Sequence, residues 1–219
     1  MTASTAIPPL CTLLQTILLT SALLLMSACT EKQEPFPDLV TEFADIHTDS
    51  NGTFTDMTTD NGTRYSILNT NIQPHRPDTT YRAVVGYVPE SVAPAMPAAR
   101  IYSLTAARIL ADSAEVLRHD PTGIESMWRQ GAYINMQLTA RTQSGTQYWG
   151  FATDSVCHAW TDGHTHYHLS IHHDQGQDPT SYSRTYYCSI PLTAIEGYSN
   201  DDTVSVTVHT FRGSLTWTF

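Results

Sequence analysis

The chain has 219 residues, which is enough for one or two domains with cores of their own. Hydrophobic residues make up 41% of it and charged residues only 15%, a composition that excludes an intrinsically disordered protein. The formal net charge is −10 and Lys32 is the single lysine, which excludes a nucleic-acid partner, because phosphate binding needs clustered basic residues. Threonine is the commonest residue and favours β structure.

The N-terminal residues have the features of a leader peptide. An apolar run over residues 17–26 is too short to span a membrane comfortably, and it is followed by a Ser-Ala-Cys sequence that ends at Cys29. Small residues before a cysteine resemble the bacterial lipobox, in which the leader is cut off and the cysteine is acylated. We therefore expect a lipoprotein signal peptide over residues 1–28, lipidation at Cys29 and a short tether over residues 29–37. The alternative is an uncleaved membrane anchor.

Short strands separated by turn residues follow the tether. Asn-Gly pairs at 51–52 and 61–62 predict hairpin turns, because both residues of a type I′ turn need positive φ. Five short strands in about 70 residues are typical of a small barrel of the OB type. The sequence therefore predicts an OB-like β-barrel domain over residues 38–112. Its predicted strands cover residues 40–47, 53–59, 63–68, 81–88 and 100–104.

The second half of the chain has a different composition. Residues 122–130 predict a short helix, and the polar stretch from Asp112 to Gly123 is expected to be the least packed part of the chain. Further strands without intervening helices predict an antiparallel β-sandwich domain over residues 113–219, so the expected fold class is all-β. Ser144 and Gly145 are expected to form a hairpin turn between the first two of these strands. The predicted strands cover residues 132–142, 147–153, 165–172, 182–192, 204–211 and 214–219.

The sequence resembles the NigD-like family of envelope lipoproteins. Beside the lipobox, the likeness rests on residues 128–135 (Trp-Arg-Gln-Gly-Ala-Tyr-Ile-Asn), 173–179 and 189–192 (Ser-Ile-Pro-Leu). It covers residues 38–219 and implies an N-terminal OB-like domain and a C-terminal β-sandwich, in the envelope of Bacteroides-type bacteria. The family name comes from a bacteriocin-associated gene cluster, and the resemblance implies no catalytic residues.

A histidine-rich strand is the most prominent candidate for chemistry. Its histidines alternate with apolar residues, so they are expected to share the solvent-facing side of the strand while the apolar residues face the core. Imidazoles two positions apart can bind Zn²⁺ or Cu²⁺, especially with Asp162 or Asp174 nearby. The alternative is a polar outer face that binds no metal. The four candidate metal ligands are His164, His166, His168 and His172.

Signatures of known enzyme classes are otherwise missing. The sequence has no Gly-x-Ser-x-Gly, Ser-x-x-Lys or His-Glu-x-x-His motif and no phosphate-binding glycine loop. The run from Asp174 to Asp178 lacks the third acidic position and the distal glutamate of a calcium-binding EF-hand, so a hairpin loop is expected there. A Ser-His-Asp triad assembled in three dimensions stays open, because all three residue types are abundant.

Two cysteines, Cys157 and Cys188, remain once the leader is removed and Cys29 is acylated. The envelope is oxidising, which favours a disulfide between close cysteines, but the sequence does not fix the distance between these two. We expect two separate buried thiols, with Cys188 in the sandwich core, and keep the disulfide as the alternative.

These features predict a non-enzymatic lipoprotein of the cell envelope, anchored in the outer membrane through Cys29, with no cofactor and no catalytic residue. We expect it to bind an envelope protein or a glycan, as an accessory or bacteriocin-immunity component. The alternative is a metal-binding protein or a metal-dependent hydrolase that uses zinc or copper at His164–His172. A third alternative is a structural subunit of a surface assembly.

Overall fold

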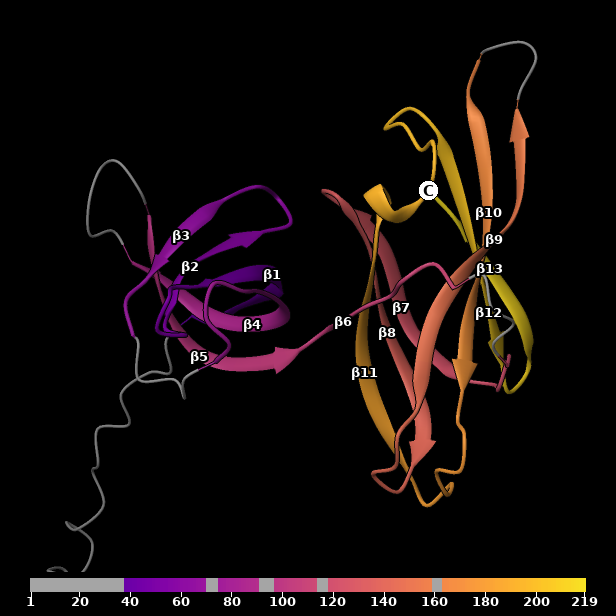
Figure 1. Ribbon diagram of the computed structural model, residues 1–219, viewed down its shortest axis with the longest axis horizontal. Coiled ribbons are helices and arrows are strands. Elements are labelled where there is room, and N and C mark those ends of the chain that lie inside the picture. The colour runs from indigo at the N-terminus through magenta and orange to yellow at the C-terminus, as the bar shows by residue number, and fades with distance from the viewer. Residues whose placement is uncertain (1–37, 70–74, 91–96, 114–117, 159–162) are drawn as a thin grey trace, which may run out of the picture. The chain divides into compact units, whose positions relative to one another are not determined.

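The computed structural model describes residues 38–69, 75–90, 97–113, 118–158 and 163–219. The predicted signal peptide, the tether and Cys29 lie outside these ranges. The described residues form strands and one short 3₁₀ turn, η1 (Leu192–Ala194), which confirms the predicted all-β class (Figure 1). In this part of the chain no helix is long and apolar enough to cross a membrane.

The first five strands close into a barrel with the order β1-β2-β3-β5-β4, as predicted (Figure 1). All neighbouring pairs are antiparallel except β3 and β5, which are parallel. A closed barrel leaves no free strand edge, and its inward residues fill the centre. The strands are β1 (Val40–Thr48), β2 (Phe54–Thr59), β3 (Arg64–Ile67), β4 (Thr80–Glu90) and β5 (Ala98–Ala106).

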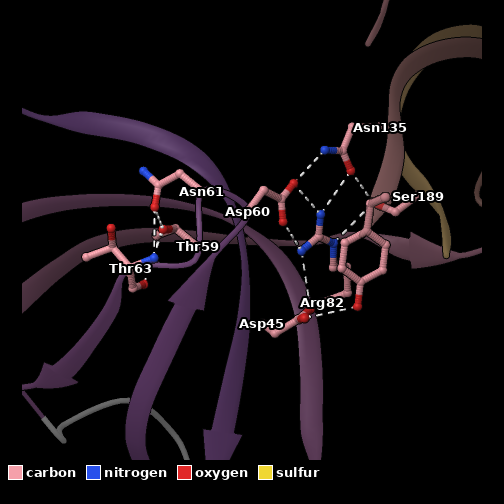
Figure 2. A network of polar contacts seen from close by, with 9 residues as sticks. Asp45, Thr59, Asp60, Asn61, Thr63, Arg82, Asn135 and Ser189 are labelled. Atoms are coloured by element: carbon pink, nitrogen blue, oxygen red, sulfur yellow. Dashed lines mark hydrogen bonds and ion pairs between the residues drawn. The ribbon is translucent and has the colours of Figure 1, made fainter. Parts of the chain in front are cut away.

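The two Asn-Gly turns join neighbouring strands, but they are not type I′ turns. Only the glycines have positive φ, 77° at Gly52 and 87° at Gly62. In the second turn the Asn61 carboxamide oxygen accepts hydrogen bonds from the Thr63 amide and the Thr59 hydroxyl (Figure 2). A side chain that bonds the backbone two residues on stabilises a wider loop, in which the asparagine keeps a negative φ.

The strand β1 buries two consecutive residues, Phe43 and Ala44, on opposite faces. Ala44 belongs to the barrel core with Ile46, Met57 and Val85. Phe43 points outward, and its ring makes edge contacts with aromatic rings of the second half of the chain. Phe43 is therefore buried outside the barrel, against Trp128 of β7 and Tyr187 of β11.

Two four-stranded sheets form the predicted sandwich. One has the order β13-β12-β10-β9 and the other β6-β11-β8-β7 (Figure 1). The pairs β10–β12 and β6–β11 are parallel, so the sandwich is mixed rather than purely antiparallel as expected. The strands are β6 (Arg108–Ile109), β7 (Gly123–Gln130), β8 (Tyr133–Thr142), β9 (Tyr148–His158), β10 (Thr165–Asp174), β11 (Tyr182–Pro191), β12 (Thr203–Thr210) and β13 (Gly213–Thr218).

Apolar residues alternate with polar ones along the sandwich strands, and the apolar ones form the core. Alternate residues of β8, β10 and β12 are buried and face the other sheet. Burial of each large apolar side chain stabilises the fold by about 1.5–3 kcal/mol. These core residues are Ile134, Met136 and Leu138 from β8, Tyr167, Leu169 and Ile171 from β10, and Val204, Val206 and Val208 from β12.

The predicted helix over residues 122–130 is wrong. This segment is β7, which pairs with β8 in antiparallel register and ends at the positive-φ residue Gly131. A segment this short gains little from helical propensity, so pairing with a long neighbouring strand decides its structure.

The backbone around the expected domain boundary at residue 112 is hydrogen-bonded to the sandwich strands where the structure describes it. β6 already pairs with β11, and Leu110 is buried in the sandwich core. The Ser113 amide donates to the Phe151 carbonyl, and the Asp120 amide donates to the His173 carbonyl. The side chains of Asp112, Arg118, His119 and Pro121 are exposed, so this stretch combines a bonded backbone with little side-chain packing, and its expected loose packing stays a prediction.

Candidate functional site

The histidine-rich strand is β10, and the first three candidate ligands lie at its start. His164 is exposed just before the strand, and the rings of His166 and His168 stack with centroids 4.1 Å apart. His166 Nε2 is 2.8 Å from the Ser205 hydroxyl. Burial lowers the pKa of His166, and the neighbouring His168 lowers it further. These imidazoles thus interact with one another and with a hydroxyl of β12.

The fourth candidate, His172, is only 6% exposed, so the expectation that it faces solvent is wrong. Residues 118–122 run between the ends of β10 and β12, with bridges from His119 to His173 and from Thr122 to Thr210. This places the His119 ring beside both His172 and His209, at a centroid distance of 4.6 Å in each case. The sequence pattern missed this cluster because its members come from three separate segments.

The surroundings of His172 favour its neutral form. Burial lowers the pKa of His172, and His119 and His209 lower it further, against the opposing effect of Asp154 and Asp112. The buried Nδ1 atom of His172 has no hydrogen-bond partner among the described residues. A charged imidazole would cost free energy in this environment.

The described residues bring together no group of three or more His, Cys, Asp or Glu side chains that could hold a metal ion. Asp162, one of the expected additional ligands, lies outside the described residues. Asp174, the other, accepts a hydrogen bond from the Gly176 amide and shapes the loop after β10. The four histidines proposed as a metal site therefore divide into a stacked pair, an exposed residue and a buried one.

A buried arginine lies at the centre of a polar network that the sequence did not predict (Figure 2). The Arg82 side chain is 1% exposed and forms a two-pronged ion pair with Asp60, with nitrogen–oxygen distances of 2.6 and 2.7 Å. A third nitrogen–oxygen contact, of 3.3 Å, joins it to Asp45. The guanidinium also lies 3.8 Å from the centre of the Tyr133 ring, in a cation–π contact.

The same network joins the barrel to the sandwich. Arg82 on β4 donates to the Ser189 hydroxyl on β11 and to the Asn135 carboxamide oxygen on β8 (Figure 2). Asn135 in turn donates to Asp60 at 2.6 Å. Burial and the negative charge of Asp45 raise the pKa of Tyr133 to about 12, and the Tyr133 hydroxyl donates a hydrogen bond to the Asp45 carboxylate. Every polar group of the network is thus paired, as a structural network requires.

An apolar pocket of about 360 Å³ lies where the start of β7 meets the turn between β12 and β13. Phe211 is 60% exposed and Leu215 is 49% exposed on its rim. The Thr122 hydroxyl, which is buried, has no hydrogen-bond partner among the described residues. A pocket with exposed apolar side chains on its rim is typical of a binding surface.

The loops after β8 and β10 form a second pocket, of about 600 Å³. Both loops were predicted to be hairpins, and both predictions are wrong, since β8 and β9 lie in different sheets, as do β10 and β11. The loops are held together by Asp178, which accepts hydrogen bonds from the Gln143 and Gly145 amides and from the Thr142 hydroxyl. Burial alone would raise the pKa of Asp178, but these hydrogen bonds lower it to about 2.

The two cysteines are free, as expected, but only one of them is buried. Cys188 has no exposed surface and lies in the sandwich core, where burial raises the pKa of its thiol to about 12. Cys157 is exposed on β9, in the opposite sheet. The two thiols are therefore not in a position to form a disulfide.

A closed OB-like barrel followed by a two-sheet sandwich defines this chain as a two-part all-β protein. A family model described as the NigD-like C-terminal beta sandwich domain matches residues 106–219. That is more than half of the sequence, and the chain belongs to the NigD-like family. No curated protein is similar enough to the sequence to count as a match.

Several solved structures share the fold over most of the chain. A NigD-like immunity protein from Bacteroides caccae is 22% identical with a TM-score of 0.65, over 84% of this chain and 94% of that one. A protein described as toxin-related, from Parabacteroides distasonis, is 15% identical with a TM-score of 0.66, over 83% and 92%. A protein described as a lipoprotein, from Bacteroides fragilis, is 11% identical with a TM-score of 0.51, over 82% and 96%. At these identities the likeness shows the fold.

Proposed function

We propose that this protein is a lipid-anchored envelope protein that binds a protein partner through the apolar pocket of its sandwich, as an accessory or immunity component. Cys29 is the proposed anchor, and the outer membrane is the proposed location. Membership of the NigD-like family supports this role, as do structural neighbours described as an immunity protein and as a lipoprotein.

The observation that carries the proposal is the rim of the apolar pocket. Phe211 and Leu215, in the hairpin of β12 and β13, both line the pocket and expose large apolar surfaces, and Ile124 extends the apolar lining. Exposed aromatic and aliphatic anchors next to a pocket are typical of the centre of a protein–protein interface.

A catalytic role has less support. On β10, His166 and His168 stack on one another, and His166 and His172 each have one ring nitrogen hydrogen-bonded to a serine, Ser205 and Ser170 respectively. The buried carboxylates of Asp60 and Asp178 are fully engaged in the arginine network and in the loops of the second pocket. Groups that are already paired in this way are poorly placed to attack or protonate a substrate.

Crosslinking in native envelopes tests the proposed binding surface. We expect the wild-type protein to capture one specific protein, and the Phe211→Asp and Leu215→Asp variants to lose it. Val156→Asp is the matched control, because Val156 is 42% exposed on β9, at the opposite edge of the same sheet. Equal capture by all four proteins would show that the pocket is not the binding surface.

A further inference from the structure

The second pocket has the chemistry of a site for an uncharged, hydroxyl-rich ligand. Its walls are the loop over residues 143–146, the loop over residues 176–179 and the side chain of Tyr148. Its volume of about 600 Å³ lies within the usual range of ligand-binding sites, roughly 300–1,000 Å³. Both loops are exposed except for Asp178.

The pocket offers no free charge to a ligand. Asp178 is the one acidic or basic side chain in its lining, and it is 4% exposed. One of its carboxylate oxygens accepts from the Gln143 and Gly145 amides, and the other accepts from Thr142 and the Gln147 carboxamide. The carboxylate is therefore used to hold the loops, and a charged ligand finds no partner of opposite sign.

The loop backbone is fixed by close contacts. A Cβ atom at Gly145 would lie 2.7 Å from the Asp178 carboxyl, so only glycine fits there. Ser144 has a φ of 74°, and its hydroxyl lies 2.9 Å from the Tyr182 hydroxyl. These constraints keep the pocket in one shape before any ligand arrives, which lowers the entropic cost of binding.

The groups available to a ligand include an aromatic ring, carboxamides and the Thr146 hydroxyl. Tyr148 is 57% exposed, so its ring is open to stacking. The Gln177 side chain has no hydrogen-bond partner among the described residues, and Gln143 uses its carboxamide oxygen to accept from Ser181, which leaves its amino group to donate. Carboxamides both donate and accept hydrogen bonds, and aromatic rings offer an apolar face.

We propose that this pocket binds a neutral saccharide. A sugar ring has an apolar face of C–H groups that matches the Tyr148 ring, and hydroxyl groups that match the carboxamides of Gln143 and Gln177. The surface is separate in sequence and lining residues from the apolar pocket around Phe211 and Leu215. A result for or against saccharide binding therefore leaves the proposal of a protein partner unchanged.

The test uses an array of neutral oligosaccharides, which are fragments of glucan, mannan, galactan and xylan. The array is probed with the purified full chain, and the affinity for each bound sugar is then measured by calorimetry. Fragments of polygalacturonate and heparin serve as acidic comparators. We expect binding of a neutral sugar that weakens at least about tenfold in Tyr148→Ala and in Gln177→Ala, and that persists in Tyr148→Phe, which keeps the ring. Tyr102→Ala is the matched control, because Tyr102 is 55% exposed on the barrel strand β5 and is expected to leave binding unchanged.

Three results would overturn the proposal: no neutral sugar bound at millimolar concentration, binding of the acidic fragments alone, or binding by Tyr148→Ala and Gln177→Ala as tight as by the wild type. Thermal unfolding of each variant shows whether it is folded. Because Tyr148 and Gln177 are both exposed, their substitution is expected to leave the fold intact.

Discussion

Arg82 shows how strongly one residue's surroundings decide its role. It is one of several arginines spread among acidic residues, and its sequence neighbours suggest an ordinary polar strand position. In the folded chain its guanidinium is 1% exposed and contacts groups from β1, β8, β11 and the turn after β2. A buried charge is tolerated only when it is paired and hydrogen-bonded on all sides.

Replacing Arg82 with Ala is expected to destabilise the protein by about 3–5 kcal/mol, because the carboxylate of Asp60 stays buried without its partner. Urea unfolding at neutral pH measures this loss. Arg100→Ala is the control, since the Arg100–Glu90 ion pair is partly exposed and is expected to contribute less than about 1 kcal/mol. Equal losses in the two variants would contradict the structural role of Arg82.

The two free thiols are expected to differ sharply in reactivity. Iodoacetamide applied to the folded, unreduced protein should label Cys157, which is exposed, and leave Cys188 unlabelled, because Cys188 is buried and its thiol pKa is raised to about 12. Unfolding should make both cysteines reactive. Peptide mass spectrometry reads the result, and a disulfide between the two peptides would refute it.

Changing Cys29 to Ser tests the proposed anchor. We expect loss of fatty-acid labelling and release of the protein from the membrane fraction, because the acylated residue is gone. A Cys157→Ser variant is the control and should stay with the membrane. Membrane-bound, fatty-acid-labelled Cys29→Ser protein would show that the anchor lies elsewhere.

At the scale of elements, the short segment over residues 118–122 determines which histidines of the sandwich lie together. It runs between β10 and β12 and brings His119 against His172 and His209. The neighbouring His173 is 2% exposed and stacks on Trp149 at 4.1 Å. Burial lowers the pKa of both His172 and His173, so the folded state binds protons more weakly than the unfolded chain does.

This predicts that the sandwich loses stability in mild acid. Each histidine's contribution is fully present above about pH 6.5, the pKa of the unfolded residue, and falls as the pH drops toward the lower folded pKa. Between pH 7.5 and 5.5 we expect each of the two to lower the stability by no more than about 1.4 kcal/mol, which is the limit for one group whose unfolded pKa is about 6.5. Circular dichroism melting at the two pH values measures it.

A His172→Gln variant should show a smaller difference in melting temperature between the two pH values than the wild type. His158→Gln is the control, because His158 is exposed on β9. The window lies above the range in which carboxylates titrate, so loss of the Asp178 hydrogen bonds does not contribute. If the melting temperature of His172→Gln changes between the two pH values as much as that of the wild type, groups other than His172 cause the acid sensitivity.

At the scale of the whole molecule, the sandwich extends further toward the N-terminus than the expected boundary at residue 112. β6 and Leu110 belong to it, and the family match begins at residue 106. The Arg82 network then adds hydrogen bonds from the barrel to Asn135 and Ser189, which have no exposed surface.

A fragment over residues 106–219 is therefore expected to melt at a higher temperature than one over residues 118–219. The shorter fragment lacks β6 and the bonds between residues 110–113 and the strands β9 and β11. Differential scanning calorimetry of the two fragments measures the difference. Equal melting temperatures would show that residues 106–117 add nothing to the stability of the sandwich.

The local sequence pattern correctly predicts the all-β class, the five barrel strands and six of the eight strands of the sandwich, because alternating burial and turn residues act over short distances. It failed at β7, where pairing overrode a local pattern, and at the loops after β8 and β10, which cross between sheets. The buried Arg82, the His119–His172–His209 cluster and the two pockets were decided by tertiary structure alone. Each of them combines side chains from segments far apart in sequence, and no local spacing encodes which strands become neighbours.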